Sequence, residues 1–156
     1  MRFKISVVTL VGVWTAAALY VGLGAQTAVN PVNPVNPAKS RSVLEGVYSD
    51  DQAKRGAAIY EQDCASCHGQ AMEGLDMAPP LNGGAFISNW SSLTVGDLFE
   101  RIRLTMPDGD PGKLSRQQNA DVVAYILKLS KYAAGTAELP IQVEVLKQIR
   151  FEPPKL

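Results

Sequence analysis

The residues of this chain with the most distinctive chemistry form the sequence Cys-Ala-Ser-Cys-His at positions 64–68. Cys64 and Cys67 stand three positions apart, so on one helical turn both thiols lie on the same face, with His68 directly after them. This is the C-x-x-C-H pattern by which a c-type haem is attached, each sulfur forming a thioether to one porphyrin vinyl group. His68 then lies beneath the iron. The pattern predicts one covalent haem c, with Cys64 and Cys67 binding the porphyrin and His68 binding the metal.

Two other uses of the same residues have less support. A structural zinc site takes four Cys or His ligands as a rule, whereas the whole chain holds two cysteines and one histidine. A dithiol redox pair of the thioredoxin kind needs a strand-helix-strand setting, and no such pattern surrounds the motif. With both thiols committed to the haem, no disulfide framework is expected.

His68 is the only histidine of the chain, so a second imidazole cannot complete the coordination of the iron within one monomer. The thioether sulfur of methionine is the next natural ligand for a c-type iron. Beyond the first residue, the chain offers Met72, Met77 and Met106.

Met106 is the best of these candidates for the distal ligand. It lies beyond a predicted helix, which gives the chain room to pass to the other face of the haem, and Pro107 biases it towards an extended conformation. Met77 is not excluded by reach, because an extended chain covers about 3.3 Å per residue. Met72 is expected on the surface or in packing. An open or otherwise filled iron site is the remaining alternative.

Four helical segments should position these residues, and each has a recognisable start signal followed by apolar residues at helical spacing. The signals are, in chain order, Ser49 or Asp50, Thr94 with Asp97, Ser115 with Gln118, and Pro140. No convincing alternating strand is found. We therefore expect an all-α fold, with several helices and long loops wrapped around a haem that supplies much of a limited core.

The segment from Gly69 to Leu93 carries no helix or strand signal, and a loop of that length is unusual in a small domain unless it has a task. We expect it to wrap the edge of the haem. Within it, Trp90 is the preferred contact to a haem propionate, because a buried indole N–H needs a partner. Arg101, Arg103 and Lys113 could neutralise the same groups, although solvated basic side chains are commoner.

The chain divides into four predicted parts. Residues 1–25 carry a basic start and a long uncharged run, which is typical of a signal peptide or of a retained membrane anchor. Residues 26–46 form an Asn/Pro-rich linker, 47–150 the folded domain, and 151–156 a tail. Either interpretation of the first part places the domain outside the cytoplasm, in the periplasm, tethered to the inner membrane if the run is retained.

Several further motifs accompany the cysteine pair: Gly56 and Tyr60 before it, Pro79-Pro80-Leu81-Asn82-Gly83 and Met106-Pro107 after it, and residues 124–127 near the end of the third predicted helix. Together they resemble the class I, single-haem cytochrome c family over about residues 51–129. The resemblance implies that His68 is the proximal ligand. It also implies that the carbonyl of Pro79 accepts a hydrogen bond from the other imidazole nitrogen.

The resemblance implies a helix crossing as well. Gly56 and Tyr60 would meet Tyr125 and Leu129 where the first and last core helices cross, with the glycine allowing close approach. This role is structural.

The expected ligation bears on function. A six-coordinate iron with one histidine and one methionine has no vacant position for a substrate, and methionine raises the reduction potential relative to two histidines. We expect a one-electron carrier in a periplasmic or membrane-associated redox chain, not an enzyme. The balanced charge of 15 basic and 15 acidic residues gives no basic patch for nucleic acid.

The partner is expected by resemblance alone. Residues 79–86, Trp90 and residues 105–107 are similar to bacterial cytochromes that accept electrons from quinoprotein (PQQ) alcohol or sugar dehydrogenases, and to cytochrome subunits of some haem-copper oxidases. We expect a dehydrogenase as the donor and another redox protein as the acceptor. Two alternatives stay open: a cytochrome subunit fixed in a membrane respiratory complex, and a haem enzyme or gas sensor with a labile sixth ligand.

Overall fold

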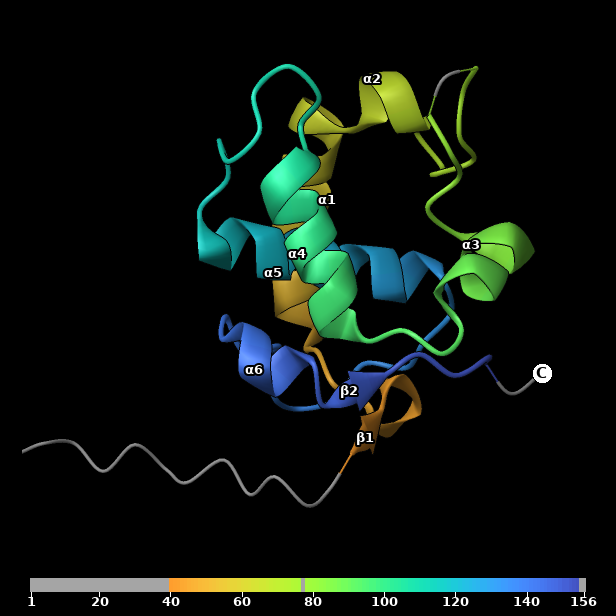
Figure 1. The fold of residues 1–156 in the computed structure, drawn as a ribbon, viewed down its shortest axis with the longest axis vertical. Helices are drawn as coiled ribbons and strands as arrows, with labels where there is room; N and C mark the ends of the chain where they lie inside the picture. Colours follow the sequence, from red (N-terminus) through yellow and green to blue (C-terminus); the bar gives the residue numbers. More distant parts are fainter. Residues whose placement is uncertain (1–39, 77, 155–156) are drawn as a thin grey trace, which may run out of the picture. The chain divides into compact units, whose positions relative to one another are not determined.

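The computed structural model describes residues 40–76 and 78–154 (Figure 1). Along these residues the elements are β1 (Arg41–Ser42), the 3-10 turn η1 (Val43–Glu45), α1 (Asp50–Asp63), α2 (Ala65–His68), α3 (Gly83–Trp90), α4 (Val95–Thr105), α5 (Arg116–Leu129), α6 (Val143–Leu146) and β2 (Ile149–Arg150). The fold is mostly helical, as predicted. The predicted signal or anchor at residues 1–25 lies outside the described residues. In the two described ranges, no helix has both the length and the apolar character needed to cross a bilayer.

The three long helices begin where their capping chemistry predicts. Ser49 precedes α1, and its side chain accepts a hydrogen bond from the backbone of Gln52. α4 and α5 begin with the capping boxes predicted at Thr94 and Ser115, in which side chain and backbone satisfy one another reciprocally.

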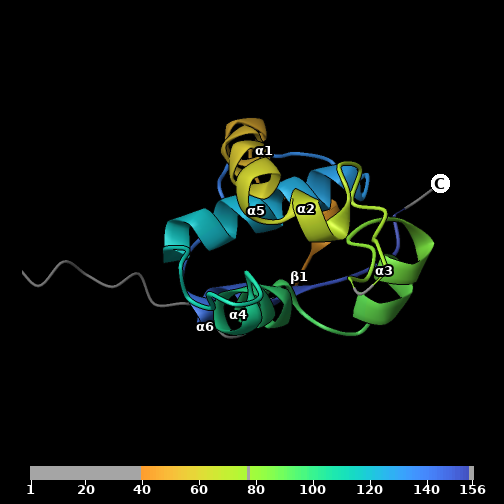
Figure 2. The same ribbon diagram turned by 90° about the horizontal axis from the view of Figure 1, so that it is seen from above.

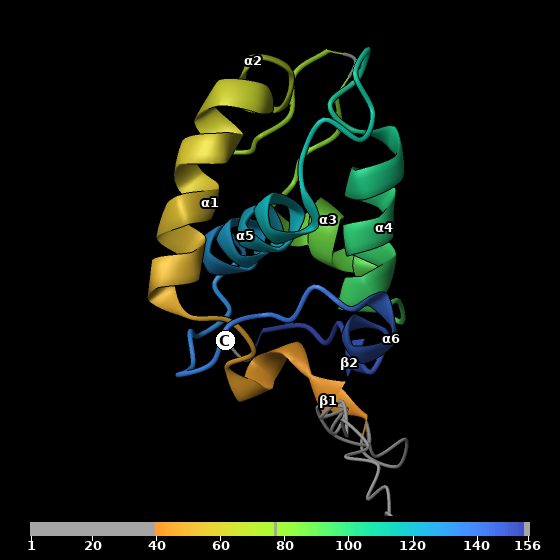
Figure 3. The same ribbon diagram turned by 90° about the vertical axis from the view of Figure 1, so that its left-hand side faces the viewer.

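α5 lies between α1 and α4 (Figures 2 and 3). α1 crosses α5 at Gly56, where an added Cβ would lie 1.9 Å from the backbone oxygen of Asp121, so no larger residue fits without displacing a helix. One turn later the rings of Tyr60 and Tyr125 meet edge to face, with centroids 5.6 Å apart. The close helix crossing implied by the resemblance is therefore present at Gly56 and Tyr60.

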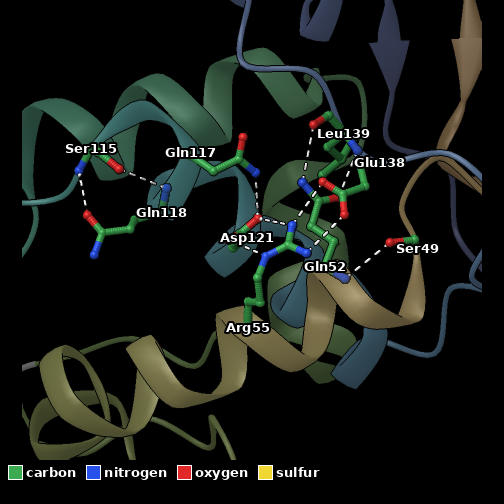
Figure 4. A network of polar contacts seen from close by, with 9 residues as sticks. All are labelled: Ser49, Gln52, Arg55, Ser115, Gln117, Gln118, Asp121, Glu138 and Leu139. Atoms are coloured by element: carbon green, nitrogen blue, oxygen red, sulfur yellow. Dashed lines mark hydrogen bonds and ion pairs between the residues drawn. The ribbon is translucent and has the colours of Figure 1, made fainter.

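A polar network fastens the segment after α5 to the same crossing (Figure 4). Arg55 on α1 donates two hydrogen bonds of 3.0 Å to the carboxylate of Asp121 on α5, and two more, of 3.0 and 2.9 Å, to Glu138. The buried amide of Gln52 bonds both the N–H and the carbonyl of Leu139, at 2.7 and 3.2 Å. These contacts fix the first half of α1, and the last residue of α1 leads into the cysteine motif.

The predicted loop from Gly69 to Leu93 contains a helix, α3, which the sequence analysis did not predict. Its first residues are glycines, which normally indicate a loop. The helix is held by tertiary contacts instead: Phe86 is buried and lies edge to face with Phe151, with centroids 6.0 Å apart. Phe151 stands in the predicted tail, so the folded part includes at least the beginning of residues 151–156.

At the other end, the folded part begins inside the predicted linker. Arg41 and Ser42 pair in parallel with Ile149 and Arg150, and Val43 is fully buried. A two-residue strand is too short to show an alternating pattern, which is why the sequence analysis found no strand. The last helix begins later than its predicted start signal at Pro140, because α6 spans Val143–Leu146.

Candidate functional site

The cysteine motif forms a separate turn at the end of α1. α1 ends at Asp63, and Cys64, with φ −129° and ψ −36°, directs the chain into α2. The backbone N–H groups of Cys67 and His68 both donate to the carbonyl of Cys64, at 3.1 and 3.0 Å. The predicted single helical turn is therefore present. Both thiols are free, Cys64 half-buried and Cys67 exposed, so both are available for covalent attachment.

His68 is buried and has a defined orientation. Its side chain is 8% exposed, and its Nδ1 lies 2.8 Å from the carbonyl oxygen of Pro79, the contact that the resemblance implied. A carbonyl can only accept, so Nδ1 carries the proton and donates it. The lone pair of Nε2 is then free to bind a metal.

The turn after His68 is held by contacts that the sequence analysis did not predict. The buried hydroxyl of Tyr60 donates to the carbonyl of Gly69 at 2.7 Å, and the N–H of Gly74 donates to the carbonyl of His68 at 2.8 Å. Gly69 has a φ of +82°, a conformation that favours glycine. Only a packing role could be predicted for Tyr60, because no local pattern in the sequence indicates where a phenolic hydroxyl will donate.

The electrostatics of Cys64 differ from those of a redox-active thiol. Burial, with smaller contributions from the charges of Asp63 and Cys67, raises the pKa of the Cys64 thiol to about 11, and Lys113 acts in the opposite sense. Dithiol oxidoreductases depend on a lowered thiol pKa, because the thiolate is the nucleophile. The environment of Cys64 therefore disfavours the dithiol interpretation.

Met106 ends α4. Its N–H donates to the carbonyl of Ile102 at 2.9 Å, and its φ of −127° and ψ of 152° are extended, as predicted for a residue before proline. The side chain is partly buried against the core. His68 is the last residue of α2, which follows α1, whereas Met106 directly follows α4. α1 and α4 lie on either side of α5 (Figure 3), so the two candidate ligands come from different sides of the domain.

The other two methionines have different positions. Met72 is fully buried in the core, which agrees with the predicted packing role. Met77 lies outside the described residues, so its candidacy as a ligand stays a prediction.

Trp90 lies at the end of α3, half-buried, with its ring 6.0 Å from those of Phe86 and Phe151. These contacts place the indole in an aromatic cluster. Its contact to a haem propionate stays a prediction.

The donor set fits a c-type haem. Two free thiols stand on one turn, the adjacent imidazole has one nitrogen engaged and one free, and a thioether is available from another helix. In the part of the chain that the structure describes, no three side chains of His, Cys, Asp or Glu gather as metal ligands. The zinc interpretation therefore gains no support there.

Of the comparisons with known proteins, the match to a family model agrees with this chemistry. Residues 51–126 match the family model described as cytochrome C oxidase, cbb3-type, subunit III. No curated protein matches the chain. Among solved structures, a chain of the sulfane dehydrogenase SoxCD from Paracoccus pantotrophus is similar, with a TM-score of 0.44 and 24% sequence identity. The match covers 72% of this chain and 60% of that one.

Residues 51–126 thus match a cytochrome c family domain, and the described residues form a mostly helical structure that is consistent with a small cytochrome c fold. Domains of this family bind a covalent c-type haem that contains iron. This haem is the cofactor that the motif predicts. A cytochrome c domain implies electron transfer and fits a location outside the cytoplasm.

Proposed function

We propose that this chain is a one-electron carrier that uses a single haem c, attached through Cys64 and Cys67 and ligated by His68 and Met106. The observation that carries the proposal is the hydrogen bond of 2.8 Å between Nδ1 of His68 and the carbonyl of Pro79, which leaves Nε2 free. When bound, haem supplies an iron that alternates between Fe(III) and Fe(II) and so stores one electron.

The protein residues would control that iron in three ways. The two thioethers fix the porphyrin on the turn at the end of α1. The carbonyl of Pro79 holds the imidazole of His68 in one tautomer and raises the basicity of Nε2. Met106, which directly follows α4, would supply a thioether as the second protein ligand of the iron. An iron held by both side chains would have no site for a substrate, so the chain would carry electrons without chemistry of its own.

For the partner, we propose a quinoprotein (PQQ) dehydrogenase as the electron donor, in the periplasm. The proposal is supported by the resemblance of residues 79–86 and 105–107 to cytochromes that serve such enzymes. A second candidate is a cytochrome subunit of a membrane respiratory complex. It is favoured by the description of the matching family model, which names a subunit of a cbb3-type oxidase.

A redox titration of the exported, haem-loaded protein tests the carrier proposal. We expect one reversible transition that follows a one-electron Nernst curve. Several transitions, or an electron number other than one, would contradict it.

Stopped-flow mixing separates the two partners. The oxidised protein is mixed with a reduced PQQ-containing alcohol dehydrogenase, and the reduced protein with a cbb3-type oxidase in detergent. Rapid reduction by the dehydrogenase supports the first candidate. Rapid oxidation by the oxidase without reduction by the dehydrogenase supports the second.

A further inference from the structure

We propose that the ion pair between Lys113 and Asp63 is a strap that holds the loop of Met106 against the end of α1, and thereby sets how readily Met106 leaves the iron. This inference rests on the proposed function, because it takes Met106 as the distal ligand. Lys113 and Asp63 are positioning residues, since neither is proposed as a ligand of the iron.

The loop in question joins α4 to α5 and comprises residues 106–115 (Figures 1 and 3). Near its end, Nζ of Lys113 donates to Oδ1 of Asp63. Asp63 is the last residue of α1 and directly precedes Cys64. The ion pair therefore connects the loop that begins with the candidate distal ligand to the turn that carries both haem cysteines.

Only the acidic partner of this ion pair is buried. The side chain of Asp63 is 8% exposed, whereas that of Lys113 is 42% exposed. A carboxylate removed from water is costly without a partner, so Asp63 favours the conformation in which Lys113 reaches it. The hydrogen bond to Asp63 and its negative charge raise the pKa of Lys113, which keeps the ammonium charged.

The backbone transmits this restraint towards Met106. The N–H of Asp110 donates to the carbonyl of Pro107 at 3.0 Å, and the N–H of Lys113 donates to the carbonyl of Asp110 at 3.3 Å. Two consecutive turns thus link the residue after Met106 to Lys113. If Lys113 is released from Asp63, this chain of turns loses its attachment to α1.

The far end of the loop is fixed independently. Leu114 is buried, and its carbonyl accepts a hydrogen bond of 3.0 Å from the side chain of Asn119 on α5. Release of Lys113 should therefore leave α5 in place and free the part of the loop next to Met106. This separates an effect on ligand exchange from an effect on the fold.

The test measures how tightly imidazole binds to the oxidised, haem-loaded protein, since imidazole must displace the distal ligand. Lys113→Met keeps the aliphatic stem and removes the charge. We expect its apparent affinity for imidazole to exceed that of the wild type by about two- to fivefold, the range that a partly exposed ion pair can supply. Lys113→Arg, which keeps the charge, should restore the wild-type affinity.

A matched control is Lys128→Met, which removes an ion pair with Asp50 of 2.7 Å at the opposite end of α1. It should leave imidazole binding unchanged. Denaturant unfolding of both variants shows whether any difference follows global stability, which the strap does not require.

Two outcomes overturn the inference and are distinguishable. If Met106→Ala binds imidazole more tightly than the wild type while Lys113→Met behaves like Lys128→Met, the strap is wrong and the ligation stands. If Met106→Ala binds imidazole no more tightly than the wild type, the distal assignment fails, and the strap fails with it.

Discussion

The carbonyl oxygen of Pro79 lies 2.8 Å from Nδ1 of His68, although the two residues are eleven positions apart in the chain. The contact determines which imidazole nitrogen is protonated and which is free. It depends on backbone geometry at Pro79, since the group that accepts the hydrogen bond is a main-chain carbonyl. A single structural feature thus connects the cysteine turn, the loop that follows it and the proposed iron ligand.

Met106→Ala should leave the haem attached and open the iron. The thioethers do not depend on Met106, while the iron would lose its proposed distal ligand. We expect the reduced variant to bind carbon monoxide at once, with a shifted absorption spectrum. Met72→Leu is the control, because Met72 is a fully buried core residue, and a swap of similar volume should leave the spectrum unchanged. If carbon monoxide leaves the spectrum of Met106→Ala unchanged, Met106 is not the distal ligand.

Gly56→Ala should destabilise the domain by about 2–3 kcal/mol, because the added methyl overlaps the backbone of Asp121 and forces α1 away from α5. Gly84→Ala on α3 is the matched control, since an added Cβ there meets nothing within 4 Å. It should change stability by less than about 1 kcal/mol, in the stabilising direction. Urea unfolding of the two holoproteins measures both. Equal stabilities would show that the helix crossing tolerates the extra atom.

Tyr60→Phe should cost about 1–3 kcal/mol, because the carbonyl of Gly69 loses its buried hydrogen-bond donor. The effect should be largest around the cysteine turn, so amide hydrogen exchange of residues 64–74 should accelerate more than that of α5. Tyr125→Phe removes a hydroxyl from the other, partly exposed ring of the same pair and should have a smaller effect. The reverse order would contradict the role given to the Tyr60 hydroxyl.

Stability should fall on the alkaline side of pH 10. Burial, with a smaller contribution from the charge of Asp50, raises the pKa of Tyr48 from 10.0 to about 12. Between these values the unfolded chain has released the Tyr48 proton and the folded chain has kept it, so the folded state loses stability as pH rises.

Tyr48→Phe tests this origin. The variant loses the hydrogen bond of 2.7 Å to the carbonyl of Tyr132, which lowers stability at every pH below 10 alike. Its stability should decline less steeply than that of the wild type between pH 10 and 12, as followed by urea unfolding. An unchanged slope would assign the alkaline loss to other groups.

The sequence predicted the features whose chemistry is local. The capping boxes at Thr94 and Ser115 need only residues three positions apart, and the C-x-x-C-H turn needs five consecutive residues. Each signal lies within one helical turn, so the chain around it is sufficient to interpret it. The resemblance added the contact between His68 and Pro79 and the close crossing at Gly56.

The features that were missed depend on residues far apart in the chain. α3 begins with glycines and is stabilised by Phe151, which lies beyond α6 in the chain. The pairing of Arg41 with Ile149 joins the two ends of the folded part. The ion pair between Asp63 and Lys113 likewise has no local signature, although it lies beside Cys64.

The most direct test of the account is the absorption spectrum of the exported, dithionite-reduced wild-type protein before and after carbon monoxide is added. We predict a low-spin c-type spectrum that carbon monoxide leaves unchanged, because the proposed ligands His68 and Met106 would leave no position on the iron for it. A prompt spectral shift would show an open or labile iron. It would contradict the closed carrier and favour a haem enzyme or gas sensor.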